Sequence, residues 1–276
     1  MRPLEILIPI LLVLYLVWPQ PRPWIIRLAP LLAVAAVALH WFIEGYRWQM
    51  IPLYLLTLAL AAGSVMKTTK KNGRRKFAAA LTLILLAFST ALPILLPVPK
   101  IPAPRGDFSV GTRLVELTDT SRMEIYSGRS GEPRRFMIQA WYPAALSSED
   151  SLAPWMADAA LFTPAISGMI GMPFFFLDHL ALAKTPAFQS PQISDSAGRF
   201  PLIIFSHGWK GFSASNTSQA IELASRGYVV IALHHTYGAI TTVFADGTVV
   251  PFNPAALPAD ENDPNYEEVA RKVDEQ

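Results

Sequence analysis

Residues 200–239 read FPLIIFSHGWKGFSASNTSQAIELASRGYVVIALHHTYGA, and this stretch decides the fold. The apolar run 201–205 predicts a strand that leads into a glycine-flanked turn. A helical pattern over 217–225 follows, and Gly227 is its stop signal. The second apolar run, 228–233, then predicts a parallel neighbouring strand. The stretch is therefore expected to form one βαβ unit.

The ends of these two strands are the expected place for chemistry. In open α/β sheets, ligands bind outside the carboxyl ends of the strands. His207, Gly208 and Trp209 follow the first predicted strand, and His234 and His235 end the second. Because parallel strands end at the same edge, we expect these residues to share one site.

Charge divides the chain into two parts. Residues 1–100 hold eleven Lys or Arg against two acids, so the remaining 176 residues hold twelve against nineteen. The net charge of +2 therefore combines +9 in the first part with −7 in the second. The chain is 52% hydrophobic, and the excess lies almost entirely in the first hundred residues. This pattern predicts a membrane region followed by a globular domain.

Apolar segments within residues 1–100 predict about four membrane-spanning helices, since a span needs about 20 residues. They cover residues 4–18, 24–43, 51–66 and 77–98. The first and third are short, and the first has no small-residue cleavage site of a signal peptide after it. The connection 67–76 carries six positive charges and no acid, which favours a cytoplasmic position over nucleic-acid binding. The C-terminal domain is then expected outside the cytoplasm of a bacterial-type inner or plasma membrane, in the periplasm or extracellular space.

The globular part begins after a proline-rich linker. Repeated prolines before residue 105 cannot continue a helix, so residues 101–108 are expected to be an extended connection. Alternating patterns over 111–118 and 135–142 predict an antiparallel hairpin. Residues 144–198 lack a strand period and are expected to form a helical insertion. Its apolar cluster at 169–177 is interpreted as core, with a lipid-facing lid as the alternative.

Three short sequence motifs, in their order and spacing along the chain, resemble one group of α/β-hydrolases. They are PLIIFSHG at 201–208, LASRGYVV at 223–230 and Trp-Tyr-Pro at 141–143. The group contains the platelet-activating-factor acetylhydrolases, with related bacterial lipases and dienelactone-hydrolase-like esterases. The resemblance covers about residues 111–239 and implies that residues 109–276 form the N-terminal half of an α/β-hydrolase fold. It also implies a carboxylic-ester hydrolase of the 1-alkyl-2-acetylglycerophosphocholine esterase type.

The resemblance assigns roles to the His-Gly turn. Acyl transfer places negative charge on a carbonyl oxygen, and backbone N–H groups aimed at that oxygen stabilise it. The Trp209 N–H is expected to be one such oxyanion donor, with Gly208 making room for the substrate and His207 supporting the loop. The alternative is an ordinary strand-to-helix turn without a catalytic role.

The nucleophile is missing from the sequence. Such enzymes carry it in a G-x-S-x-G pentad, followed by an acid and a histidine. No such pentad occurs; residues 211–215 come closest, but position 215 is serine. A helix is expected over 266–273, and in the family such a helix precedes the nucleophile strand. The chain is therefore expected to be truncated before its catalytic triad and to be inactive alone. A genomic sequence that continues into a G-x-S-x-G pentad would favour an enzyme over a non-catalytic protein.

Other kinds of site receive less support. Histidines near the strand ends could gather with Asp246 around a metal, but no helical His-x-x-x-His spacing supports this. Glycine-rich phosphate loops are also absent, and the lack of cysteine excludes disulfides and thiol catalysis. We therefore expect no metal, no cofactor and no nucleic-acid partner.

The sequence as a whole predicts a membrane-anchored ester hydrolase that cleaves short acyl esters, phospholipids included, by a Ser-His-Asp mechanism. Its expected partners are the lipid bilayer and the ester substrate. A different class stays open, namely a non-catalytic, membrane-anchored binding or interaction protein built on a hydrolase half-domain.

The charged connection generates a topology prediction. A reporter that is active only outside the cytoplasm should be active when fused after Gln276 and silent when fused at Gly73. Neutral substitution of Lys70, Lys71, Arg74 and Arg75 should give mixed topology, because the positive-inside bias is then largely lost. Reporter activity at the two fusion points measures this, and the reverse pattern in the wild type would contradict the orientation.

Overall fold

The computed structural model describes residues 1–66, 72–196, 198–256 and 265–274. By its internal contacts the chain divides into two compact units, Met1–Val98 and Pro99–Gln276. The first is helical and the second is an α/β domain, and each is described by itself.

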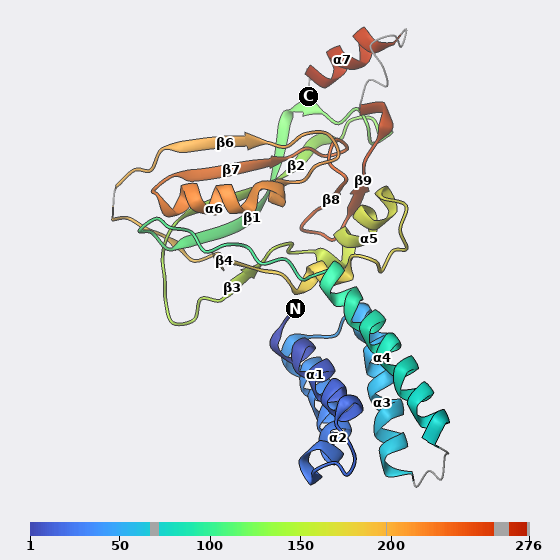
Figure 1. Ribbon diagram of the computed structural model, residues 1–276. Coiled ribbons are helices and arrows are strands. Elements are labelled where there is room, and N and C mark those ends of the chain that lie inside the picture. The colour runs from blue at the N-terminus through green and yellow to red at the C-terminus, as the bar shows by residue number, and fades with distance from the viewer. Residues whose placement is uncertain (67–71, 197, 257–264, 275–276) are drawn as a thin grey trace. The chain divides into compact units, whose positions relative to one another are not determined.

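The α/β domain is built on a mixed sheet with the strand order β3-β4-β1-β2-β7-β6 (Figure 1). Its strands are β1 (Val110–Met123), β2 (Pro133–Ala145), β3 (Leu152–Pro154), β4 (Lys184–Gln189), β6 (Leu202–Ser206) and β7 (Val229–His234). The short β5 (Gln192–Ile193) pairs with β2, and β8 (Thr241–Val243) pairs with β9 (Val249–Pro251) as a second sheet. The antiparallel pairing of β1 with β2 confirms the predicted hairpin.

The predicted βαβ unit is also confirmed. β6 and β7 pair in parallel, from Leu202 opposite Val229 to Ser206 opposite Leu233, and α6 (Thr217–Ser225) connects them. Gly227 follows the helix with φ +90°, a conformation in which a side chain would be strained. The helix ends where the sequence predicted because its apolar positions stop there.

Two apolar clusters hold the domain together. Ala220, Ile221 and Ala224 of α6 pack against Val110 and Trp141 of the hairpin strands, together with β7. A separate cluster joins α5 (Ala159–Met169) to the segment around Ile240, with Phe212 packed against it. Elements from distant parts of the chain are thereby fixed around the ends of β6 and β7.

Residues 144–198 differ from the predicted helical insertion. They contain α5 and a 3-10 helix at Asp178–Leu182, but also β4, which pairs in parallel with β1. The core position predicted for residues 169–177 is wrong, because Phe174 is 70% exposed and Met169 50% exposed. Near the C-terminal end, α7 (Tyr266–Asp274) forms where a helix was expected.

One edge of the sheet carries uncovered apolar side chains. Among the described strands, β6 pairs only with β7. Ile203 and Phe205 pack toward the α6 cluster, whereas Leu202 and Ile204 on the other face are 55% and 64% exposed.

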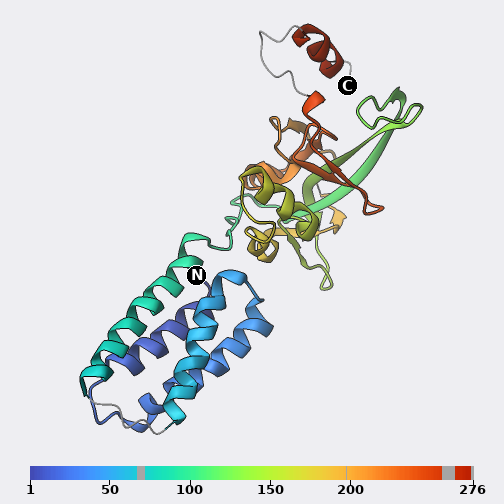
Figure 2. The same ribbon diagram turned by 90° about the vertical axis from the view of Figure 1, so that its right-hand side faces the viewer.

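The helical unit contains four main helices lying side by side (Figure 2). They are α1 (Pro3–Val17), α2 (Trp24–Leu39), α3 (Ile51–Val65) and α4 (Asn72–Leu95). A π-helical turn, His40–Glu44, extends α2, and a 3-10 turn, Trp48–Met50, precedes α3. Ile8, Leu12, Leu53 and other apolar residues form its core.

Three segments of this unit are long and apolar enough to cross a membrane: Trp24–Glu44, Trp48–Val65 and Phe77–Leu95. Pro3–Val17 is a shorter apolar helix, so the predicted count of four spans is not confirmed. The surface of the unit is strongly apolar, with Phe42 88% exposed and Phe88 75% exposed. In the predicted cytoplasmic connection 67–76, residues 67–71 and the side chains of 72–76 lie outside what the structure describes.

A buried ionic cluster fastens one end of the helical unit. Arg47 Nη1 lies 2.9 Å from Glu5 Oε1, and both side chains are fully enclosed. Arg47 also donates to the carbonyl of Leu96, beyond the end of α4. Arg2 donates to Glu5 and to the carbonyl of Glu44. The cluster therefore ties the start of α1 to the ends of α2 and α4.

Glu5, His40 and Glu44 in this cluster have the spacing of a metal site, with ligand atoms within 4.8 Å of one another. However, Arg2 Nη2 lies 2.9 Å from Glu5 Oε1 and 3.2 Å from His40 Nε2. The guanidinium thus occupies the position of a cation, and we interpret the group as an ion-pair cluster.

Because the cluster is buried, we expect one isosteric substitution in it to cause a large loss of stability. Glu5→Gln should lower the unfolding free energy by about 3–5 kcal/mol, because Arg47 would stay buried without a counter-charge. Thermal unfolding of the chain in a non-ionic detergent, followed by circular dichroism, measures this. Arg27→Gln, at an exposed position of α2, is the control and should change little. Equal melting of the Glu5→Gln variant and the wild type would show that the pair contributes nothing.

Candidate active site

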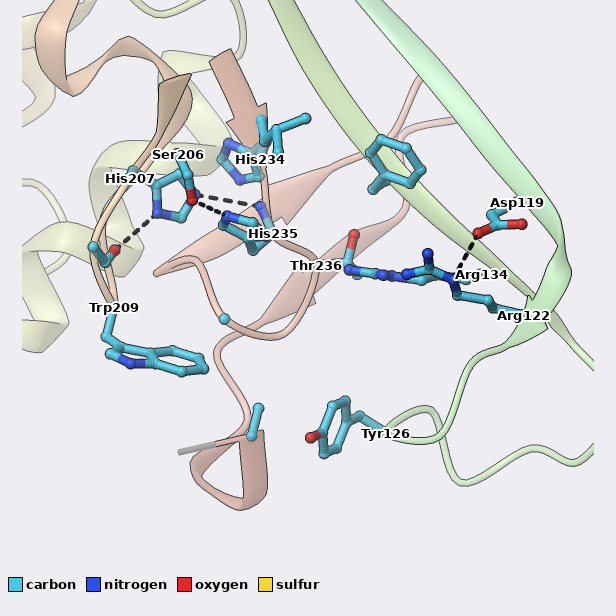
Figure 3. Close-up of a pocket in the computed structure, with 15 residues that line it drawn as sticks. Asp119, Arg122, Tyr126, Arg134, Ser206, His207, Trp209, His234, His235 and Thr236 are labelled. Carbon is cyan, nitrogen blue, oxygen red and sulfur yellow. Dashed lines mark hydrogen bonds and ion pairs between the residues drawn. The ribbon is translucent and has the colours of Figure 1, made fainter. Parts of the chain in front are cut away.

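The ends of β6 and β7 form one wall of a cavity of about 540 Å³ (Figure 3). Ser206 and Leu233 are partners in the parallel register, so the residues after them emerge side by side. The segments 206–209 and 233–236 line the cavity on this wall, with Gly238 beside them. The structure therefore brings together the two groups of residues that the sequence placed at the strand ends.

His207 closes the turn after β6 by two hydrogen bonds. Its Nε2 accepts from the backbone N–H of His235 at 3.3 Å, so its Nδ1 carries the proton and donates to the carbonyl of Gly208 at 2.8 Å. The ring is 7% exposed. His207 thus joins the β6 turn to the end of β7.

The glycine that this turn requires sterically is Gly211. A Cβ at position 211 would lie 2.7 Å from the carbonyl oxygen of Gly208 and 3.1 Å from His207 Nδ1. A Cβ at position 208 would meet nothing within 4 Å. The structure therefore gives no packing reason for glycine at 208.

The Trp209 N–H belongs to the turn that lines this cavity. Within the described part of the chain, no carbonyl or side chain accepts from it, whereas the next N–H, that of Lys210, donates to Gly238 at 2.9 Å. Lys210 adopts φ +55°, which turns the chain sharply after Trp209. The indole is 49% exposed, and its edge lies against Gly238, where an added Cβ would come within 3.1 Å.

His234 is a structural residue of this wall. Its Nε2 donates to the carbonyl of Thr241 at 2.8 Å, and its Nδ1 accepts from the N–H of Ser213 at 3.3 Å. Burial lowers the pKa of His234 to about 4, so the ring is neutral at neutral pH. Both ring nitrogens are thereby used to connect the β6 turn, β7 and β8.

His235 faces the cavity. Its Nε2 lies 2.7 Å from the hydroxyl of Ser206, which is exposed at the end of β6. Burial, followed by the nearby charges of His207 and Arg134, lowers the pKa of His235 to about 4. Burial also lowers the pKa of His207. The three rings that line the cavity are therefore uncharged at neutral pH.

The structure does not support Ser213, which lies in the segment most similar to the pentad, as a nucleophile. It does not support a metal cluster of the histidines with Asp246 either. Ser213 is 6% exposed, its hydroxyl donates to Gln139 at 3.3 Å, and it is not among the residues that line this cavity. Asp246 does not approach the histidines, because it is paired with Arg135 at 2.9 Å. Among the described residues, these histidines gather without a carboxylate at ligand distance.

Sequence reasoning missed the opposite wall of the cavity. It is formed by the far end of the β1–β2 hairpin, through Asp119, Arg122, Tyr126, Arg134 and Phe136. The sequence placed the hairpin strands at 111–118 and 135–142, whereas β1 continues to Met123 and β2 begins at Pro133. Residues 119–122 are all polar and show no strand alternation, so the sequence carried no signal for this extension of the hairpin.

Comparison with known proteins assigns the domain. Residues 96–271, well over half of the chain, match the family model of "Platelet-activating factor acetylhydrolase, isoform II". The chain belongs to this family. Its members' names are those of ester hydrolases, so the α/β-hydrolase-like domain and the ester-hydrolase class expected from the sequence are supported.

Individual relatives in this family are distant. A "Probable 1-alkyl-2-acetylglycerophosphocholine esterase" of Arthroderma benhamiae is 27% identical over 57% of this chain and 44% of its own length. The platelet-activating factor acetylhydrolase of Canis lupus familiaris is 28% identical over 52% of this chain and 30% of its own length. The chain thus spans less than half of these curated relatives. A solved ferulic acid esterase from Streptomyces cinnamoneus has a TM-score of 0.49 and 26% identity, covering 64% of this chain and 47% of its own.

The lowered pKa values predict acid sensitivity. An unfolded histidine gains its proton near pH 6.5, whereas folded His234 stays neutral to about pH 4, so its stabilising effect is complete above pH 6.5 and is lost progressively down to pH 4. The loss is about 3 kcal/mol for this residue.

Thermal unfolding of the detergent-solubilised chain between pH 7.5 and pH 4.5, followed by near-ultraviolet circular dichroism, tests this. His234→Gln should lower stability at pH 7.5 but flatten its dependence on pH. The same pH dependence in the variant and the wild type would show that His234 does not titrate in this way.

Proposed function

We propose that the chain acts on carboxylic esters with short acyl groups, and that the Trp209 N–H is the donor to the oxyanion. The observation that carries this proposal is an N–H without an internal acceptor at the wall of a cavity, in a domain of an ester-hydrolase family. A carbonyl oxygen of the substrate would be its acceptor.

The surroundings of Trp209 suit this role. One oriented backbone donor typically lowers an acyl-transfer barrier by about 3 kcal/mol, provided that it does not have to reorganise. His207, Gly211 and Lys210 hold the turn by the hydrogen bonds and tight packing described above. The open space at Gly208 allows a substrate to approach the backbone. The donor is thus fixed before a ligand arrives.

The proposal assigns no nucleophile, because the sequence contains no G-x-S-x-G pentad. Ser213 is buried, and Ser206 ends a regular strand, where a nucleophile elbow would require a sharp turn. The alternative function, a non-catalytic binding protein built on this domain, would use the same cavity without acyl transfer.

The helical unit is proposed to anchor the domain in a bacterial-type inner or plasma membrane, with residues 109–276 outside the cytoplasm. Three apolar helices of sufficient length and the exposed aromatic side chains on the unit's surface support this anchoring. The positive charges of residues 67–76 support the orientation. The lipid bilayer is then the partner of residues 1–100.

Nuclear magnetic resonance of the chain labelled with ¹⁵N-tryptophan in detergent tests the donor. A methyl ketone analogue of a short acyl ester, which cannot be hydrolysed, should move the backbone amide signal of Trp209 downfield in a saturable way. Trp209→Phe identifies the signal, and the amide of Trp155, outside this cavity, is the internal control.

Saturable binding that leaves the Trp209 amide unchanged would exclude the oxyanion role and favour the binding protein. Absence of binding by the ketone and by short acyl esters would contradict the proposed substrate class.

A further inference from the structure

The indole of Trp209 is a large aromatic surface that is open to the cavity. The side chain is 49% exposed and lines the cavity next to Gly238. Among the described residues, no ring or cation lies over the indole, whereas Nζ of Lys210, the next residue, lies 4.8 Å from the ring centre of Phe252. The indole therefore has aromatic area left for a ligand to bury.

Gly238 determines where this ring lies. A Cβ added at position 238 would lie 3.1 Å from Cζ3 of Trp209 and 3.3 Å from Cβ of His235. The carbonyl of Gly238 accepts a hydrogen bond from the Lys210 N–H at 2.9 Å. The hydrogen bond thus holds the two segments together, and the missing side chain lets the indole lie against the segment that follows β7. The ring is in place before a ligand arrives, which lowers the entropy cost of binding.

Aromatic side chains also line the opposite wall. Figure 3 shows the phenol of Tyr126 pointing into the cavity from the side opposite Trp209. The centres of the Tyr126 and Tyr237 rings lie 6.0 Å apart. Phe136 lines the cavity as well, with the guanidinium of Arg134 over its ring at 5.8 Å from the centre. The cavity therefore has aromatic groups on both of these walls.

The charged groups at the opposite wall balance one another. Arg122 lies 3.4 Å from Asp119. Of the charges near Arg134, that of Glu124 acts on it most strongly, ahead of Arg122 and Asp119. Two guanidinium groups thus face two carboxylates, and the imidazole rings that line the cavity are neutral at neutral pH. The described wall carries no surplus charge, which favours an uncharged ligand.

We propose that the alcohol part of the ester is uncharged and carries an aromatic ring, which stacks on the indole of Trp209. This inference rests on the proposed function and specifies the substrate of the same site. With the carbonyl of the ester at the Trp209 N–H, the indole of the same residue is the nearest large surface for the rest of the substrate. An aromatic pair gains about two- to tenfold in affinity beyond the burial of its area.

Two methyl ketones that differ only in their ring test this proposal. They are benzylacetone, the non-hydrolysable counterpart of benzyl acetate, and its cyclohexyl analogue, in which a saturated ring replaces the phenyl ring. The chain is labelled with ¹⁵N-tryptophan and studied by nuclear magnetic resonance in a non-ionic detergent. Both ketones should move the backbone amide signal of Trp209 in a saturable way.

Only benzylacetone should also move the indole Nε1–H signal of Trp209 upfield, because only an aromatic ring has a ring current. It should bind about two- to tenfold more tightly than the cyclohexyl analogue. The indole of Trp155, which donates to the carbonyl of Ala214 and does not line this cavity, is the internal control.

Substitutions separate the indole from the backbone donor. Trp209→Leu keeps the backbone N–H but removes the indole, so the two ketones should bind with equal affinity, measured by saturation transfer from protein to ligand. Gly238→Ala displaces the indole and should lower the affinity for benzylacetone toward that for its analogue. Gly168→Ala, in α5, adds a Cβ that meets nothing within 4 Å and should bind like the wild type. Melting curves confirm that each variant is folded.

The two signals of Trp209 distinguish the possible failures. Movement of the amide without an upfield shift of the indole, or equal affinities of the two ketones for the wild type, would overturn the aromatic site and leave the proposed ester function intact. An upfield shift of the Trp155 indole in place of Trp209 would assign the ring to a second cavity, lined by Trp155 and Phe162, and also overturn the inference. If neither ketone moves the Trp209 amide, both the proposed function and this inference fail.

Discussion

The parallel pairing of β6 with β7 is the constraint on which the site depends. It places two chain turns at one edge, and the hydrogen bond from the His235 N–H to the His207 ring then locks them together. His234 extends the same connection to Ser213 and Thr241. These bonds require neutral imidazoles, which burial favours. The sheet register, the buried histidines and the fixed Trp209 N–H are therefore parts of a single arrangement.

In the helical unit, ion pairs rather than imidazole hydrogen bonds hold the ends of different elements together. Its surface is strongly apolar, and its buried charged groups are paired inside the unit. Glu5, Arg47 and Arg2 do this at one end, where helix carbonyls that lack a partner accept from the two guanidinium groups. In both units, then, a buried polar group serves to hold the end of one element against another.

The sequence alone predicted the βαβ unit and the hairpin, because apolar periodicity and the glycines that end helices or form turns are local signals. It could not predict β4, since the segment 184–189 becomes a strand only through pairing with β1 and β3. Nor could it separate Gly208 from Gly211, as the difference depends on where the His207 ring packs. Likewise, Arg134 and Arg135 are adjacent, and only the fold brings Asp246, 111 residues away, to the second of them.

The uncovered face of β6 affects how the molecule behaves in solution. Leu202 and Ile204 stand on the last described strand of the sheet, at its edge. An apolar edge strand of this kind is a template on which other chains add strands, unless a charge or a covering element prevents it. Its five residues contain no lysine, proline or bulge that would blunt the edge. Within the α/β domain, strand β6 is therefore the place where a second chain could add a strand.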